Sequence, residues 1–129
     1  MISKLKKIEL PGETFHYDLA PLFRQDELKR IDLKGKDPNY AGVLSLLYPK
    51  DGKAYMAFIL RKTYKGVHSN QIGFPGGRVE EIDENIMETA LRETEEEIGI
   101  SASSIQIIKP LTQLYIPPSN FLVHPFLSI

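Results

Sequence analysis

One segment in the second half of the chain constrains the fold most, because its pattern predicts a helix with a strongly acidic side. The helix is expected from about Glu84 to Glu97, and Gly99 is a residue of the kind that ends helices. Glu93, Glu96 and Glu97 are spaced three and four residues apart. Their side chains must therefore lie on the same side of this helix.

This acidic cluster predicts a divalent cation. Like charges at this spacing destabilise an isolated helix by about 0.2–0.5 kcal/mol a pair. A bound cation would remove this destabilisation. Carboxylate oxygens favour Mg²⁺ or Mn²⁺, and zinc is disfavoured because the chain has no cysteine and three scattered histidines. The alternative is a solvated acidic helix face. The fixed offsets of a glycine turn, Arg92 and Gly99 from the glutamates favour the cation site.

The same residues resemble the Nudix box, a motif of hydrolases that split nucleoside diphosphates linked to another group. The second half of the motif matches from Arg92 to Ile100, with Thr94 at a usually aliphatic position. The first half is one residue longer than the family pattern, so Asp83 and Glu84 compete for the first acidic position. The resemblance implies an α/β (α+β) fold, an α/β/α sandwich with a mixed sheet.

Matching the motif residue by residue implies roles for the acidic cluster. Glu93 and Glu97 correspond to the principal metal ligands, and Glu96 to a further ligand or the general base. The backbone carbonyl near Gly77 would complete the metal site, because glycine permits a close approach. Arg92, grouped with the catalytic residues, is expected to orient a glutamate through a bidentate ion pair. Additional metal or base roles are weaker possibilities for three further carboxylates, Glu80, Asp83 and Glu84.

Residues before the motif resemble the coenzyme A pyrophosphatase branch of that family. Phe74-Pro75-Gly76-Gly77 matches, and Leu60-Arg61 stands at the family spacing before it. The matched segments make Arg61, His68 and Gln71 candidates for substrate binding. The sequence departs from the branch signature at three positions, which are Lys62, Gly66 and Asn70. Tyr115 to Pro125 also resembles this branch.

The resemblance implies that coenzyme A or a derivative is cleaved to adenosine 3′,5′-bisphosphate and 4′-phosphopantetheine. Two other readings stay open. One is a Nudix hydrolase of another nucleoside diphosphate derivative, such as ADP-ribose or a dinucleotide. The other is a nucleotide-binding module without catalytic activity.

The amino-acid composition is that of an ordinary globular domain. The chain has 129 residues, of which 42% are hydrophobic and 26% charged, and we expect neither a secretory signal nor a bilayer-spanning helix. With no cysteine, a cytoplasmic location is the default expectation. Residues 78–99 contain nine acidic side chains and two arginines, and no basic stripe suggests nucleic acid. We expect a small-molecule substrate and neither a nucleic-acid nor a membrane partner.

The remaining pattern divides the chain into an N-terminal arm with a short helix, residues 1–35, and a Nudix domain, residues 36–129. Residues 1–20 read as irregular and 21–32 as a helix. Strands are expected at 42–48, 54–61, 71–74, 105–114 and 121–129, with a turn at 49–52. The helix should place a stripe of Met87, Leu91, Thr94 and Ile98 on the sheet. The chain stops within an expected strand, so we expect an incomplete domain that self-associates, for example as a homodimer.

Overall fold

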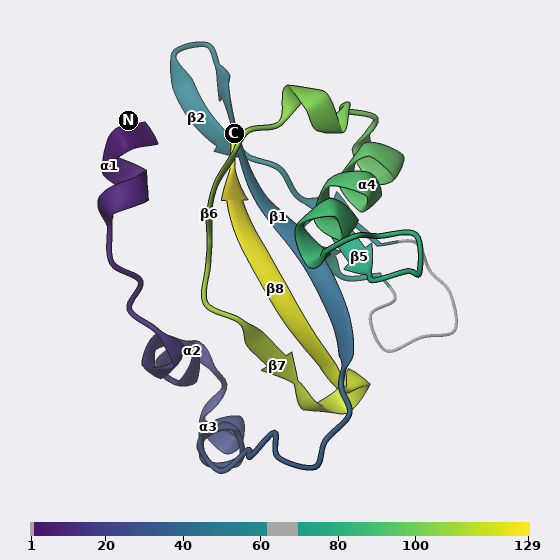
Figure 1. Ribbon diagram of the computed structural model, residues 1–129. Coiled ribbons are helices and arrows are strands. Elements are labelled where there is room, and N and C mark those ends of the chain that lie inside the picture. The colour runs from purple at the N-terminus through teal and green to yellow at the C-terminus, as the bar shows by residue number, and fades with distance from the viewer. Residues whose placement is uncertain (1, 62–69) are drawn as a thin grey trace.

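A mixed β-sheet with one long helix across it forms the centre of the protein (Figure 1). The structure is a computed structural model and describes residues 2–61 and 70–129. The strands are β1 (Asn39–Lys50), β2 (Lys53–Met56), β3 (Ile59–Leu60), β4 (Ile72–Gly73), β5 (Gly76–Arg78), β6 (Ile107–Pro110), β7 (Leu114–Ile116) and β8 (Phe121–Ser128). The helices are α1 (Ile2–Lys7), α2 (Glu13–Leu19), α3 (Leu22–Lys29), α4 (Ile86–Ile98) and the short 3₁₀ turns η1 (Ala102–Ser104) and η2 (Pro117–Ser119).

The central sheet is six-stranded, with the order β2-β1-β8-β6, while β5 pairs with β1 and β7 with β8. Strands β3 and β4 form a separate two-stranded sheet.

The core lies between the parallel pair β1–β8 and helix α4. Leu44 and Leu46 of β1 are buried and form a cluster with Ala90 of α4. Gly42 lies on the same side of β1, and a methyl group there would stand 2.3 Å from the carbonyl oxygen of Ile86. Because Gly42 has no side chain, α4 can lie directly on the strand, which fixes the position of the acidic helix relative to the sheet.

Helix α4 confirms the predicted helix, with its first residue two positions later than expected. Its N-cap is Asn85, whose side chain accepts a hydrogen bond from the Glu88 amide at 3.0 Å. Gly99 ends the helix in the left-handed conformation, with φ of 72°. Thr94 is fully buried, and its hydroxyl donates to the Ala90 carbonyl at 2.6 Å. A threonine is therefore accommodated where the family has an aliphatic residue.

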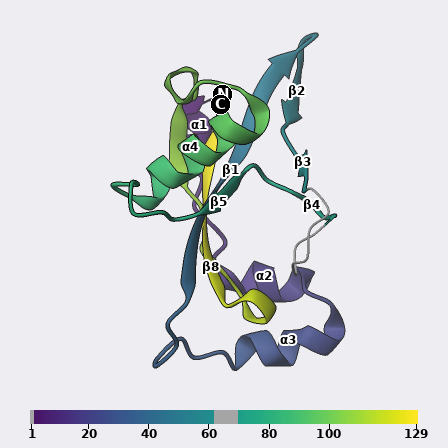
Figure 2. The same cartoon turned by 90° about the vertical axis from the view of Figure 1, so that its right-hand side faces the viewer.

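The N-terminal segment is helical, so the prediction of an irregular arm over residues 1–20 was wrong. Both α1 and α2 have no buried residues. They are too short to produce a long apolar stripe, and Pro11-Gly12 separates them. Helix α3 confirms the predicted helix at 21–32, but Leu22 is 85% exposed and does not join a core. Figure 2 shows α2 and α3 at the end of the sheet away from α4.

Two predicted strands are each divided in the structure. The segment expected at 54–61 forms β2 beside β1 and then β3 beside β4, and between them the Phe58 ring stacks on Phe74 at 5.2 Å. The segment expected at 105–114 forms β6 and β7, which both pair with β8. Pro110, which has no amide donor, ends β6. The predicted turn at 49–52 is shorter, because only Asp51 and Gly52 leave the hairpin, with φ of 51° and 73°.

Among the helices of the described residues, none has the length and apolar character needed to cross a bilayer.

Candidate metal-binding and hydrolytic site

Two glutamates of α4 lie over the two glycines that begin β5, where the sequence predicts a glycine turn. A methyl group at Gly77 would be 2.4 Å from the carboxyl carbon of Glu93, so this carboxylate rests against the Gly77 backbone. Glu97 accepts a hydrogen bond from the Gly76 amide at 2.8 Å. Gly77 can approach the helix this closely because it has no side chain, whereas a methyl group at Gly76 would meet Gly42 and Val43 of β1. The predicted proximity of Gly77 to the acidic cluster is therefore present in the structure.

Arg92 connects the acidic groups around this turn. Its Nε and Nη2 donate to the two carboxylate oxygens of Asp83 at 2.8 and 2.9 Å. Its Nη1 donates to Glu93 at 2.9 Å and to Glu96 at 3.3 Å. The expected bidentate ion pair is thus formed, but its acceptor is an aspartate and not a glutamate. One guanidinium group holds Asp83 on one side and two of the predicted ligands on the other.

Of the two candidates for the first acidic position, Asp83 is the one that Arg92 contacts. The Asp83 side chain is only 3% exposed. It accepts further hydrogen bonds at 2.9 Å from the Glu80 amide and the Thr89 hydroxyl. The Arg92 guanidinium, supported by these donors, holds the pKa of the Asp83 carboxyl well below its usual range. Glu84 is exposed, whereas Asp83 is held by Arg92 and stays ionised at neutral pH.

The three glutamates on α4 influence one another electrostatically. Partial burial raises the pKa of the Glu97 carboxyl, and the nearby charges of Glu93 and Glu96 raise it further. The Gly76 amide and the positive charge of Arg61 act in the opposite direction on the same pKa. Although Glu97 as a whole residue is exposed, its carboxylate is held at the turn by that amide. Arg61 therefore belongs to the surroundings of the acidic cluster.

The structure brings most of the predicted site residues together. Arg92, Glu93, Glu96, Glu97 and Gly77 meet at the junction of α4 and β5. Arg61 reaches this junction from the end of β3, and its amide donates to the Gln71 carbonyl at 2.9 Å. The Gln71 side chain is exposed beside it. His68 lies outside the described residues.

The donor chemistry of this junction fits magnesium or manganese. Within residues 2–61 and 70–129, no three aspartate, glutamate or histidine side chains already converge as a metal cage. Mg²⁺ is usually held by one or two protein carboxylates, with water and substrate phosphate completing its coordination. Glu93 and Glu97, with Glu96 beside them, supply such a partial set of ligands.

Sequence reasoning underestimated two contributors to the site. The first is the Gly76 amide, which holds Glu97. The second is Thr89, which is fully buried and donates to Asp83. A backbone donor has no sequence signal of its own. Thr89, however, is spaced three residues before Arg92, which places both on one side of α4.

Comparison with known proteins agrees with this combination of a mixed sheet, a glycine turn and an acidic helix. The profile of the NUDIX domain matches residues 38–128, so the chain belongs to the Nudix hydrolase family. The Nudix hydrolase NudL of Yersinia enterocolitica is 40% identical over 62 residues, covering 48% of this chain and 31% of that protein. The mouse peroxisomal coenzyme A diphosphatase NUDT7 is 31% identical over 87 residues, covering 67% of this chain and 36% of that protein. The chain spans about a third of the length of such curated relatives.

Solved structures support the same fold. The Ap4A hydrolase of Caenorhabditis elegans aligns with a TM-score of 0.58 at 20% identity, covering 71% of this chain and 67% of that one. A MutT/nudix family protein from Enterococcus faecalis aligns with a TM-score of 0.55 at 25% identity, covering 90% of this chain and 47% of that one. These alignments agree with the predicted mixed α/β Nudix fold.

Proposed function

We propose that this protein hydrolyses the pyrophosphate bond of coenzyme A or a derivative, giving adenosine 3′,5′-bisphosphate and 4′-phosphopantetheine, with Mg²⁺ or Mn²⁺ as cofactor. The observation that carries the proposal is the ordered acidic junction. Arg92 holds Glu93, while the glycine turn receives Glu93 at Gly77 and Glu97 at Gly76. Such an arrangement is suited to binding a metal together with a diphosphate.

Some residues of the junction would bind the metal, and Arg92 would hold one of these ligands in place. A pyrophosphate repels an attacking water because of its negative charge, so a bound metal would neutralise that charge and acidify the water. Glu93 and Glu97 would hold the metal, with Glu96 as a further ligand or as the general base. Arg92 keeps Glu93 in place through a charge-assisted hydrogen bond of 2.9 Å.

Arg61 is suited to a substrate phosphate. Its positive charge faces Glu97, so an anionic group approaching the metal would also approach this guanidinium. Arginine favours phosphate because its donors lie in a planar fork. Gln71, whose carbonyl accepts from the Arg61 amide, would contribute beside it. His68 keeps its proposed role in substrate binding.

Coenzyme A is favoured over other diphosphates by the sequence before the box and by the relative with that activity in its name, mouse coenzyme A diphosphatase NUDT7. One departure from the branch signature keeps a backbone conformation that glycine adopts easily. Asn70 replaces a glycine and has φ of 58°, in the left-handed region that asparagine enters more readily than other residues with a side chain. Lys62 and Gly66, the other two departures, lie outside the described residues.

Those two departures also support a second candidate, hydrolysis of another nucleoside diphosphate derivative. The test is to incubate the protein with coenzyme A, ADP-ribose and a diadenosine polyphosphate, with Mg²⁺ or Mn²⁺ or with a chelator, and to identify products by mass spectrometry. Phosphopantetheine formed only with metal supports the first proposal. Cleavage restricted to ADP-ribose or the dinucleotide selects the second.

Matched variants make this test specific. Glu97→Gln should reduce turnover at least about a hundredfold, since loss of a group that merely supports a ligand already costs 10- to 100-fold. Glu81→Gln, an equal charge change at an exposed position, should leave turnover unchanged. Nucleotide binding without any turnover in the unsubstituted protein would instead select the third reading, a non-catalytic binding module.

A further inference from the structure

An apolar cavity that is open to solvent lies on the face of the sheet opposite α4. It has a volume of about 360 Å³ and is bounded on the sheet side by Val43 and Val123 and on the arm side by Phe15, which is 55% exposed. Successive residues of a strand point to opposite faces of the sheet. Gly42 and Leu44 face the helix, so Val43 faces the other side. The cavity and the acidic cluster are therefore on opposite sides of β1. The cavity is therefore separate from the proposed hydrolytic site.

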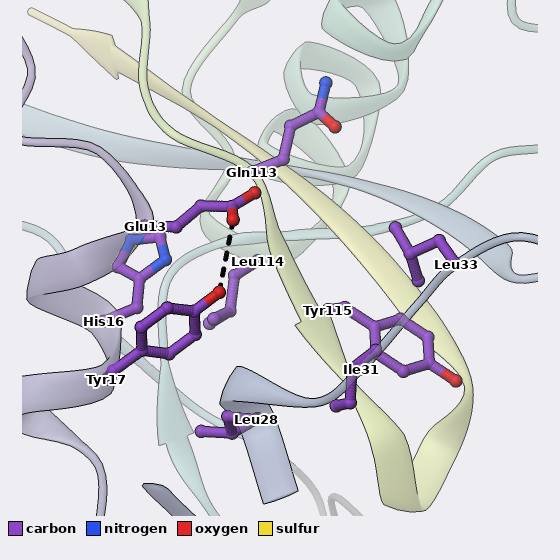
Figure 3. Close-up of a pocket in the computed structure, with 9 residues that line it drawn as sticks. All are labelled: Glu13, His16, Tyr17, Leu28, Ile31, Leu33, Gln113, Leu114 and Tyr115. Carbon is purple, nitrogen blue, oxygen red and sulfur yellow. Dashed lines mark hydrogen bonds between the residues drawn. The ribbon is translucent and has the colours of Figure 1, made fainter. Parts of the chain in front are cut away.

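A smaller pocket adjoins this cavity. His16 and Leu114 line both, so the two spaces are neighbours. Figure 3 shows this pocket, of about 70 Å³, with Glu13, Tyr17 and Gln113 beside apolar side chains such as Leu28 and Ile31. The cavity thus has an apolar body and one end at which the Glu13 carboxylate stands.

The Glu13 carboxylate retains capacity for a ligand. It accepts a hydrogen bond from the Tyr17 hydroxyl at 3.2 Å, which is long for an O–H···O bond. A carboxylate offers about four acceptor positions. Because Glu13 is exposed, it can bind a cationic group without the full cost of burying two charges.

We propose that this joined cavity binds an aliphatic amine, with the hydrocarbon chain in the apolar part and the ammonium group at Glu13. An ammonium group supplies three donors and the charge that complements the carboxylate. The apolar part holds roughly ten methylene-sized groups, if each takes about the 30 Å³ that a water occupies in the liquid. An anionic head group at the same end would be repelled by the negative charge of Glu13, so a fatty acid is expected to bind more weakly than an amine of the same length.

The proposal is tested by calorimetric titration of the whole chain with n-alkylamines of six to twelve carbons. At about pH 8 these amines are charged, since an alkylammonium titrates near the lysine value of about 10.4. The dissociation constant should fall about fourfold with each added methylene and stop falling once the cavity is full. Decylamine should bind at least about tenfold more tightly than decanoate, as expected for one charge-assisted contact. Equal binding of all lengths, or of decylamine and decanoate, overturns the proposal.

Two carboxylate variants locate the head group. Glu13→Gln, at an exposed position where folding should be preserved, should remove the preference for decylamine over decanoate. Glu97→Gln should leave decylamine binding unchanged, because it alters only the opposite face of the sheet. If Glu97→Gln weakens binding as much as Glu13→Gln, the amine binds the α4 carboxylates and the proposal fails. This outcome is independent of whether coenzyme A is hydrolysed.

Discussion

Asp83→Asn tests whether the buried ion pair with Arg92 holds the site together. The substitution keeps the size of the side chain and removes its charge. Whichever way the new amide turns, its NH₂ group faces a donor, because Arg92 donates to both carboxylate oxygens. Breaking a buried ion pair costs about 3–5 kcal/mol. The Arg92 side chain keeps 19% of its surface exposed, so we expect about 3 kcal/mol, the lower end of that range.

The loss should be measured by urea unfolding, followed by circular dichroism, with the free energy taken from the midpoint and slope. A domain of this length has a total stability of about 6–19 kcal/mol, so a loss of this size is readily measured. Glu84→Gln is the matched control. It removes the same charge from the neighbouring exposed residue and should change stability by less than about 0.5 kcal/mol.

The pH dependence gives a second measurement of the same ion pair. Because the pKa of Asp83 is lowered in the folded state, its contribution is present above the ordinary value of 3.8 and is lost as the pH falls through the lower folded value. The stability difference between the unsubstituted protein and Asp83→Asn should therefore narrow in strong acid. If Asp83→Asn and Glu84→Gln unfold at the same urea concentration near neutral pH, the reasoning is refuted.

Three further predictions concern the surroundings of the site and the core. Gly77→Ala should reduce hydrolysis at least about tenfold, because the new methyl group would displace the Glu93 carboxylate. Gly73→Ala is its control, since a methyl group there meets only ordinary contacts with Arg61, at 3.6 Å; equal activity of the two variants would contradict the prediction. Arg61→Gln should raise KM for the diphosphate substrate about tenfold, as expected for one lost charge-assisted contact, and an unchanged KM would remove Arg61 from the substrate site. Burial lowers the pKa of His124 below its ordinary value of 6.5. As the pH falls, the unfolded state therefore takes up a proton first. The folded state loses stability as the pH falls below 6.5. Urea midpoints at about pH 8 and about pH 5.5 should therefore differ more for the unsubstituted protein than for His124→Gln, and an equal change in both would contradict this.

Several features of the fold follow from local patterns in the sequence. The end of α4 was predictable because Gly99 follows a helix with a regular acidic side, whereas its start was predicted two residues too early, before the Asn85 cap. Strand β8 was predictable because apolar residues stand on both sides of His124-Pro125. The division of the segment at 54–61 was not, since it depends on Phe58 finding Phe74 and on β3 pairing with a later strand. Such contacts join residues that the sequence does not place together.

The sequence alone determined that Glu93, Glu96 and Glu97 share one side of a helix behind a glycine turn, because helical periodicity is a local property of the chain. Only the tertiary structure decided that Asp83, and not Glu84, receives Arg92. That choice depends on how the loop between β5 and α4 closes, and on which carboxylate the Thr89 hydroxyl and the Glu80 amide can reach. Spacing along a loop limits which residues can meet, whereas burial and hydrogen bonding select the one that does.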